Sequence, residues 1–315
     1  MSLNVLKPGL LTMLQDRGRF GLGALGIGCA GPMDATAHRL ANALVGNDED
    51  APALEITLVG PRLRFDADTT IALTGAPFDA TLDGHAAPMW QPLAIAAGSV
   101  LDCGRAQRGA RMSLALAGGL RCRRVLGSCA SDLNAGLGSA LAQGDTLLFV
   151  ARRTPAPRAV RWSLDPRPWF DADPERPLRL IRGHHHAALD AASQAALYRA
   201  RFRVAADSNR VGFRLDGARL ALAQPLEPVS EPVARGTLQL PPGGQPIALM
   251  AEHPVTGGYP RIGQIAGIDL DRLAQRRPGD ALRFVEIDLD EAQTRYLARE
   301  HELARLQAAI AARLP

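Results

Sequence analysis

Hydrophobic positions in the first 150 residues come in short runs, and turn-forming residues such as Gly60-Pro61 and Asp83-Gly84 separate them. The runs predict strands at residues 10–14, 53–58, 63–65, 70–74, 80–83, 93–95, 99–102, 111–116 and 146–150. Many short strands at regular spacing are typical of a barrel or sandwich, whereas alternating strands and helices would indicate a parallel sheet.

The second half of the chain repeats this organisation without a detectable sequence repeat. Strands are predicted at 178–181, 202–204, 212–215, 236–240, 247–250, 264–268 and 282–286. A Pro- and Arg-rich stretch at 151–177 separates the halves, as a linker would. We therefore expect a first unit at residues 1–160, a second at 161–287 and a terminal segment at 288–315.

Helical periodicity is confined to three stretches. After Gly31-Pro32, one helix face is formed by Ala37, Leu40, Ala41 and Leu44. An Ala-rich stretch at 189–198 predicts a second helix, and Asp288 with Glu291 resembles a capping box that opens a long C-terminal helix. The predicted fold class is mainly β (α+β), with a few helices and a long C-terminal helix.

Composition narrows the function classes. The chain is 47% hydrophobic, which is ample for two cores, and its net charge of +4 is spread along the whole length. No basic cluster indicates nucleic-acid binding, and no run approaches the ~20 apolar residues of a membrane span. Because the N-terminus also lacks a signal-peptide pattern, we expect a cytoplasmic protein.

The reactive side chains match no familiar metal or nucleotide motif. Cys29, Cys103, Cys122 and Cys129 form no C-x-x-C pair, so we expect free thiols and neither a disulfide framework nor zinc. The adjacent residues 184–186, all histidine, cannot easily face one ion, and no metal site is expected there. The glycines at 21, 23 and 26 fit the dinucleotide fingerprint only formally, because the helix begins too late. A Walker motif is absent from the sequence.

Candidate chemistry gathers in three polar segments. Gln15, Asp16 and Arg19 follow the first strand and lead through a glycine loop to a helix N-terminus. Residues 207–212 and 256–261 form two further polar loops. We expect the three segments to line a shared cleft for a small carboxylate or amide, although each could instead be only a surface turn.

These segments also carry a family resemblance. The sequence contains QDRGR-x-G, GPMD-x-x-A-x-x-x-AN-x-LVGN, APALEIT, LTGA, DSNR-x-GFRL, SEPV-x-x-GTLQLP-x-x-GQPI and TGGYPRI. From about Leu3 to Phe284 it resembles the KipA family, also called allophanate hydrolase subunit 2. Members are described as biotin-dependent carboxyltransferase-like proteins, and many look like the PxpC component of 5-oxoprolinase.

The resemblance implies a pair of cyclophilin-like β-barrel units and a role in a complex. It implies ATP-driven opening of the cyclic amide of 5-oxoproline to glutamate, with ATP handled by the complex and no cofactor or metal held by this chain. The implied partners are a KipI-like subunit (PxpB) and a LamB/YcsF-like subunit (PxpA). Biotin, if it is used, would arrive on another chain.

The resemblance also suggests roles for single residues. Asp16 and Asp34 are the candidate catalytic acid/base or polarising groups. The candidates for holding an amide are Gln15, Asn42, Ser208 and Asn209, and Arg19 or Arg210 would pair with a carboxylate. Thr256, Gly257, Gly258 and Tyr259 would form the rim. Glycine loops and Asn/Asp turns could equally serve geometry alone.

The chain departs from the family pattern at two places. It has Glu252-His253-Pro254-Val255 where an Asp and a Gln-Thr are usual, and the histidine run replaces a Gly-Pro-Glu/Gln turn. Two alternatives to the oxoprolinase therefore stay open. One is a carboxyltransferase subunit of a urea/allophanate-type enzyme, and the other is a non-enzymatic regulator that binds a KipI-like protein.

Overall fold

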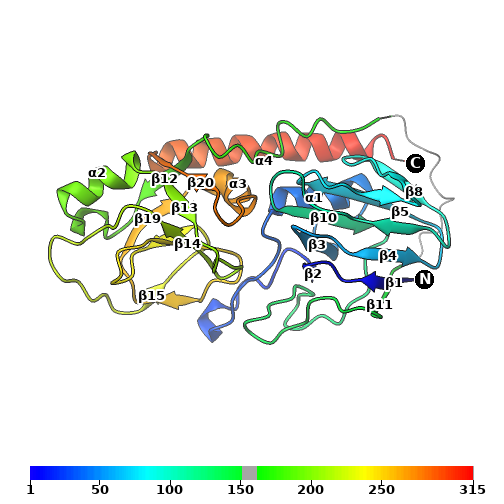
Figure 1. Cartoon of the computed structure of the whole chain (residues 1–315), viewed down its shortest axis with the longest axis horizontal. Helices are drawn as coiled ribbons and strands as arrows, with labels where there is room; N and C mark the ends of the chain where they lie inside the picture. The colour runs from blue at the N-terminus through cyan, green and yellow to red at the C-terminus, as the bar shows by residue number, and fades with distance from the viewer. Residues whose placement is uncertain (151–161, 315) are drawn as a thin grey trace. The chain divides into compact units, whose positions relative to one another are not determined.

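A computed structural model describes residues 1–150 and 162–314 of the chain (Figure 1). By their internal contacts, residues 1–19, 30–172 and 303–315 form one unit, and residues 20–29 and 173–302 form the second. The predicted boundary at residue 160 and the start of the predicted linker lie outside the described residues. The division at 160 and 287 stays a prediction.

In its described residues, the first unit contains two antiparallel sheets, the helix α1 and the end of the long C-terminal helix. Its elements are β1 (Ser2–Lys7), β2 (Leu11–Gln15), α1 (Ala35–Leu44), β3 (Ala53–Thr57), β4 (Arg62–Phe65), β5 (Thr69–Gly75), β6 (Thr81–Leu82), β7 (His85–Ala86), β8 (Pro92–Ile95), β9 (Val100–Asp102), β10 (Arg111–Leu116) and β11 (Thr146–Leu148). The six-stranded sheet has the order β11-β1-β4-β9-β6-β7, and the five-stranded sheet has the order β2-β3-β10-β5-β8. Helix α1 packs on β10 and β5 of the five-stranded sheet (Figure 1).

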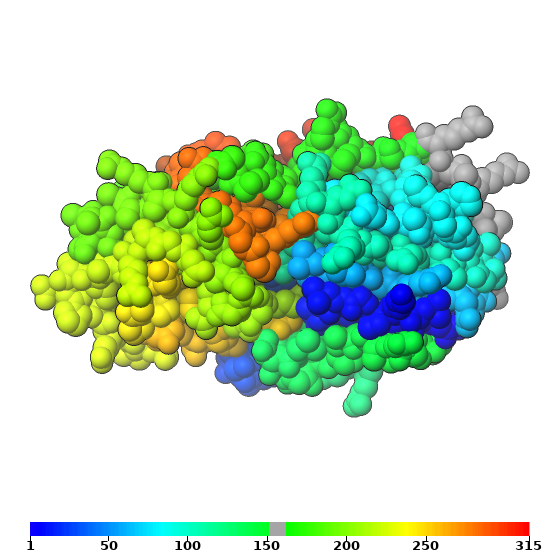
Figure 2. Space-filling model, in the orientation of Figure 1, coloured from blue at the N-terminus to red at the C-terminus, as the bar shows by residue number. Residues whose placement is uncertain are grey.

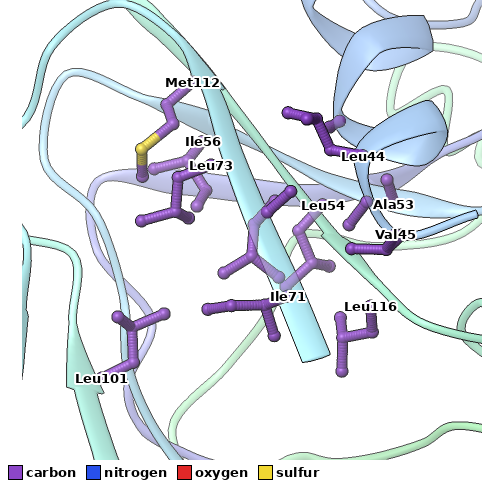
Figure 3. Close-up of a cluster of buried hydrophobic side chains, with 14 of the residues drawn as sticks. Leu44, Val45, Ala53, Leu54, Ile56, Ile71, Leu73, Leu101, Met112 and Leu116 are labelled. Carbon is purple, nitrogen blue, oxygen red and sulfur yellow. The ribbon is translucent and has the colours of Figure 1, made fainter. Parts of the chain in front are cut away.

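Aliphatic side chains fill the core of this unit. β3, β5 and β10 bury residues on both faces, which is why their sequences read as continuous apolar runs rather than alternations. Figure 3 shows Leu54, Ile71 and Leu116 close together, with Leu44 and Val45 beside them. With so few aromatic residues, the core depends on branched aliphatic packing.

The second unit is dominated by one antiparallel sheet with a single parallel pair. Its elements are η1 (Gly23–Leu25), β12 (Leu178–Arg182), η2 (His186–Ala188), α2 (Ala191–Arg199), β13 (Phe202–Val204), β14 (Gly212–Asp216), β15 (Glu231–Pro232), β16 (Thr237–Gln239), β17 (Ile247–Leu249), β18 (Thr256–Gly257), β19 (Arg261–Ile265), η3 (Gly267–Asp269), α3 (Leu270–Ala274), β20 (Ala281–Leu282) and β21 (Phe284–Glu286). The eight-stranded sheet has the order β20-β13-β14-β17-β16-β19-β12-β21, and only β12 and β21 run parallel.

The long C-terminal helix α4 (Leu289–Ala311) begins as the sequence predicts. The Asp288 carboxylate accepts a hydrogen bond from the backbone N–H of Glu291 at 2.7 Å, which caps the first turn. Ala292 packs with Ala266 and Ile287 of the second unit, whereas Leu303 and Ile310 belong to the core of the first.

The predicted mainly-β fold with few helices and a long terminal helix is confirmed. Strand β1 was not predicted, although its buried Leu3 and Val5 alternate with the less buried Ser2, Asn4 and Leu6. It lies at the surface beside β11 (Figure 2). The strand predicted at 264–268 instead spans Arg261–Ile265, because a 3₁₀ turn begins at Gly267. Within the described residues, no helix combines the length and apolar character that crossing a membrane requires.

Candidate functional site

Asp16 follows β2 directly and is almost fully buried in the first unit. One carboxylate oxygen accepts hydrogen bonds from the Ser128 hydroxyl at 2.5 Å and the Gly18 N–H at 3.0 Å. The other accepts from the Cys129 N–H at 2.7 Å, and the exposed Arg124 guanidinium lies 3.8 Å away. These donors fix a buried negative charge, which would otherwise be costly to desolvate.

Gln15 and Arg19 are held by the same stretch of chain that holds Asp16. Gln15 donates from Nε2 to the Ser131 carbonyl at 3.0 Å, and Arg19 donates from Nη2 to the Ala130 carbonyl at 2.5 Å. Both side chains are at least 96% buried. Gln15 Oε1 and Arg19 Nη1 nevertheless have no hydrogen-bond partner within the described part of the chain. The site therefore offers one unused acceptor and one unused charged donor.

A disulfide between Cys122 and Cys129 corrects the expectation of free thiols at these positions. Backbone hydrogen bonds in both directions between Val125 and Ser128 close a tight turn, in which Leu126 and Gly127 both have positive φ. This geometry is that of a type I′ turn, and it brings the two cysteine Cα atoms to 5.9 Å. Cys29 and Cys103 take no part in a disulfide.

The N-terminus of α1 lies against the backbone of Asp16 and Arg17. Gly31 has φ of +91°, and a Cβ there would stand 2.7 Å from the Arg17 carbonyl oxygen, so only glycine fits. The buried Asp34 caps the helix by accepting from the Ala37 N–H at 2.8 Å. This capping role accounts for Asp34 structurally, and its predicted catalytic role stays a prediction.

Asn42 sits one turn after the buried His38 on α1. Its amide nitrogen lies 3.2 Å from His38 Nε2 and donates to the Ala51 carbonyl at 2.9 Å, while its oxygen accepts from Asn47 at 3.0 Å. Both amide N–H groups are thereby engaged by the fold. The predicted role of Asn42 in holding a substrate amide stays untested.

His38 should make the protein sensitive to acid. Burial lowers its pKa from 6.5 to about 4, against the opposing charges of Glu55 and Asp16. Since the unfolded chain binds this proton at higher pH than the folded one, stability is complete above pH ~6.5 and falls as the pH drops toward ~4. We expect a loss of about 3 kcal/mol over this interval.

Urea unfolding measured across this pH range checks that expectation. His38→Gln should flatten the dependence, whereas His85→Gln, which alters an exposed histidine, should leave it unchanged. An equally steep dependence in His38→Gln would refute the assignment.

In the second unit, the predicted polar loop at 207–212 meets the segment before the second polar loop through a buried ion pair. Arg210 Nε lies 2.5 Å from Glu252 Oε1, and the Glu252 N–H donates to the Arg210 carbonyl at 2.8 Å. Arg210 thus pairs with a carboxylate of its own chain. That carboxylate belongs to Glu252, which lies in the segment that departs from the expected family pattern. Asn209 Oδ1 accepts from the Val211 N–H, and Ser208 Oγ accepts from the Arg214 N–H, as in local turns.

The loop that contains Thr256, Gly257, Gly258 and Tyr259 begins with β18, which pairs with β15. Tyr259 is 45% exposed. A Cβ at Gly257 would stand 2.3 Å from the Gln239 amide nitrogen, so a side chain there would displace the Gln239 amide. Gln239 is buried, and its amide nitrogen has no hydrogen-bond partner among the residues described.

The structure thus forms two clusters from the predicted residues. Gln15, Asp16 and Arg19 lie together in the first unit, and the 207–212 loop meets the segment before Thr256 in the second. The cleft shared between them stays a prediction. Ser128 and Gln239 were not among the predicted site residues. Gln239 lies in the motif G-T-L-Q-L, which was used only as evidence for the family resemblance.

The histidine run has structural contacts in the second unit. His185 Nδ1 accepts from the Arg261 N–H at 3.1 Å, and His186 Nε2 lies 3.4 Å from the Tyr198 hydroxyl. Burial lowers the pKa of both histidines, which favours their neutral forms.

Known proteins are similar in sequence to this chain over most of its length. The family model "Carboxyltransferase domain, subdomain A and B" matches residues 25–286. The chain is 39% identical over 290 residues to the C subunit of 5-oxoprolinase from Escherichia coli (strain K12), covering 92% of this chain and 93% of that protein. It is 36% identical over 307 residues to the C subunit of 5-oxoprolinase from Haemophilus influenzae, covering 96% of each.

Among solved structures, the urea amidolyase of K. lactis superposes with a TM-score of 0.87 at 27% identity over 96% of this chain. This chain spans 20% of the length of that much longer one. The two bacterial relatives match this chain over nearly their whole length, whereas urea amidolyase contains the same unit within a larger chain. The family match covers most of the sequence, and the chain belongs to the family of carboxyltransferase domains with subdomains A and B.

Proposed function

We propose that this chain is the C subunit of a 5-oxoprolinase and that the Gln15–Arg19 cluster binds the substrate. Near-complete alignment to two proteins named as that subunit supports the assignment. The observation that carries the site is the pair of buried, unpartnered atoms Gln15 Oε1 and Arg19 Nη1. Leaving such atoms unsatisfied costs about 1–3 kcal/mol each, more for a charged group, so a ligand that satisfies both gains affinity.

5-Oxoproline has the complementary groups. Its ring N–H can donate to Gln15 Oε1, and its carboxylate can accept from Arg19 Nη1. The bond from Gln15 Nε2 to Ser131 fixes the orientation of the amide, so that its oxygen is the free acceptor. Asp16, held in the same segment by Ser128 and Cys129, is our candidate acid/base group.

The complex would supply the remaining chemistry. An unstrained lactam resists water, but transfer of a phosphoryl group from ATP to the lactam oxygen makes the ring carbon electrophilic. A first water attacks that carbon, and the C–N bond opens to give the amine and an acyl phosphate on the side chain. A second water then hydrolyses the acyl phosphate, which releases phosphate and leaves the side-chain carboxylate of glutamate. Because the sequence has no Walker motif, we assign nucleotide binding to the KipI-like or LamB/YcsF-like partner.

Reconstitution tests this proposal. We expect glutamate and ADP from 5-oxoproline only when this chain is combined with both partner subunits. Glutamate formation no greater than in the two partners alone would overturn it.

A second candidate is transfer of a carboxyl group to urea, which the structural similarity to urea amidolyase favours. Urea lacks a carboxylate, so it would leave Arg19 Nη1 without its partner. An assay with urea in place of 5-oxoproline, and with a carboxylated biotinyl protein as the carboxyl donor, discriminates between the two candidate functions. Carboxylated product from urea, with no glutamate from 5-oxoproline, would establish the second candidate.

A further inference from the structure

One short turn holds the ionisable groups of the candidate site. Ser128 and Cys129 donate the hydroxyl and N–H bonds to the Asp16 carboxylate, and the Ala130 carbonyl accepts from Arg19. The Ala130 N–H donates to Ser128 Oγ at 3.0 Å, which fixes the hydroxyl in the direction of Asp16. Three consecutive residues therefore set the relative positions of a buried anion and a buried cation.

The disulfide links the middle of this segment to Cys122 and so closes the loop that leads into it. Cys129 lies in the middle of the three residues, and Cys122 lies seven positions earlier, before the turn at Leu126 and Gly127. Both turn residues are exposed, and Leu126 is a non-glycine residue with φ of +53°. A left-handed leucine is unfavourable in a free chain, so the turn needs an external constraint. The disulfide spans the turn outside the paired Val125–Ser128 hydrogen bonds and is the covalent constraint on it.

We propose that the Cys122–Cys129 disulfide is a positioning element of the candidate site, and that its reduction lowers activity by releasing the Ser128–Ala130 turn. This inference rests on the proposed function for its effect on activity, but not for its effect on the turn. Asp16 and Arg19 would each lose fixed partners in the reduced form, so that substrate binding and proton transfer would weaken together.

The chemistry requires a dithiol reductant. One thiolate of the dithiol attacks a cysteine sulfur and forms a mixed disulfide, and the other cysteine leaves as a thiolate that takes up a proton. The second thiol of the dithiol then displaces the first cysteine, which also ends as a thiol. The protein S–S bond is broken, two S–H groups form, and the dithiol is oxidised to a disulfide.

The surroundings favour this exchange at Cys122. Cys129 is buried, whereas Cys122 is partly exposed and flanked by the exposed Arg121 and Arg123. Their positive charge attracts an incoming thiolate and stabilises a departing one. Cys103, by contrast, is fully buried, and burial raises the pKa of its thiol far above the usual range, so it should stay unreactive.

Thiol labelling of the native full chain tests the covalent state. Before reduction, we expect an alkylating reagent to label Cys29 but not Cys122, Cys129 or Cys103. After mild dithiol treatment, Cys122 and Cys129 should be labelled as well. Hydrogen exchange at residues 128–130 should accelerate about tenfold or more on reduction, without any need for activity. Labelling of Cys122 and Cys129 in the untreated protein would overturn the proposal.

Activity of the reconstituted complex tests the positioning role. We expect reduction to lower kcat/KM for 5-oxoproline about tenfold and reoxidation to restore it. Cys122→Ser keeps Cys129, whose backbone N–H contacts Asp16. This variant should have the lower kcat/KM without any treatment, and dithiol should not change it further. Cys29→Ser should respond like the wild type.

The two hypotheses can fail separately. Unchanged kcat/KM in both the reduced protein and Cys122→Ser would overturn the positioning role while leaving the oxoprolinase assignment standing. Conversely, hydrogen exchange at 128–130 could accelerate on reduction while no glutamate forms in either redox state. That result would overturn the proposed function and support control of the turn by the disulfide.

Discussion

Arg19→Gln is expected to lower kcat/KM for 5-oxoproline by about 100- to 1,000-fold in the reconstituted complex. The substitution removes a charged donor that is 4% exposed, and a buried hydrogen bond between charged groups contributes several kcal/mol when one partner is truncated. Because the carboxylate is not the reacting group, most of the loss should appear in KM. Steady-state kinetics over a wide range of 5-oxoproline concentrations measures it.

Arg17→Gln is the matched control on the same loop. Arg17 is 43% exposed at its side chain and pairs with Glu49, so its removal should change kcat/KM less than about threefold. Arg19→Lys keeps the charge but loses the hydrogen bonds from the guanidinium group to the Ala130 and Val125 carbonyls. Its kcat/KM should therefore lie between those of Arg19→Gln and Arg17→Gln. Wild-type kinetics in a folded Arg19→Gln complex would remove Arg19 from the site.

Asp269→Ala is expected to lower the free energy of unfolding by about 3–5 kcal/mol, because it leaves two guanidinium groups without their shared carboxylate. Asp269 is 0% exposed. It accepts from Arg179 Nε at 2.9 Å, Arg179 Nη2 at 2.7 Å and Arg272 Nη1 at 2.9 Å. Burial is the largest single influence and raises its pKa, but the hydrogen bonds and charges of Arg179 and Arg272 together outweigh burial and hold the pKa below the usual value.

Chemical denaturation compares this variant with Asp207→Ala. Asp207 pairs with Arg214 at 3.0 Å, but their side chains are 68% and 56% exposed. Water screens that pair, so its loss should cost less than about 1 kcal/mol. Equal destabilisation by the two substitutions would mean that the Asp269 cluster contributes no more than a surface ion pair.

The secondary structure was largely predictable because its signals are local. Helix α1 and buried strands such as β10 follow from runs and spacings within a few residues. The disulfide was not predictable in this way. Its formation depends on two positive φ angles at Leu126 and Gly127, and leucine gives no sequence signal for that conformation.

Part of the candidate site in the first unit could likewise be predicted from one short sequence motif. Gln15, Asp16 and Arg19 are close in sequence, but Ser128 lies 112 positions beyond Asp16, so only the fold brings its hydroxyl there. Similarly, Glu252 could be noticed as unusual, but its pairing with Arg210 across 42 positions could not be foreseen. Spacing identifies candidate groups, whereas their bonding depends on tertiary packing.

The interleaved division of the chain has a consequence for its biosynthesis. Residues 20–29 group with the second unit, and residues from 303 onward group with the first, where Leu303 and Ile310 complete the core. A ribosome therefore releases the last segment of the first unit only after it has released the whole of the second unit. We therefore expect the first unit to reach its native state only after the second unit has been synthesised.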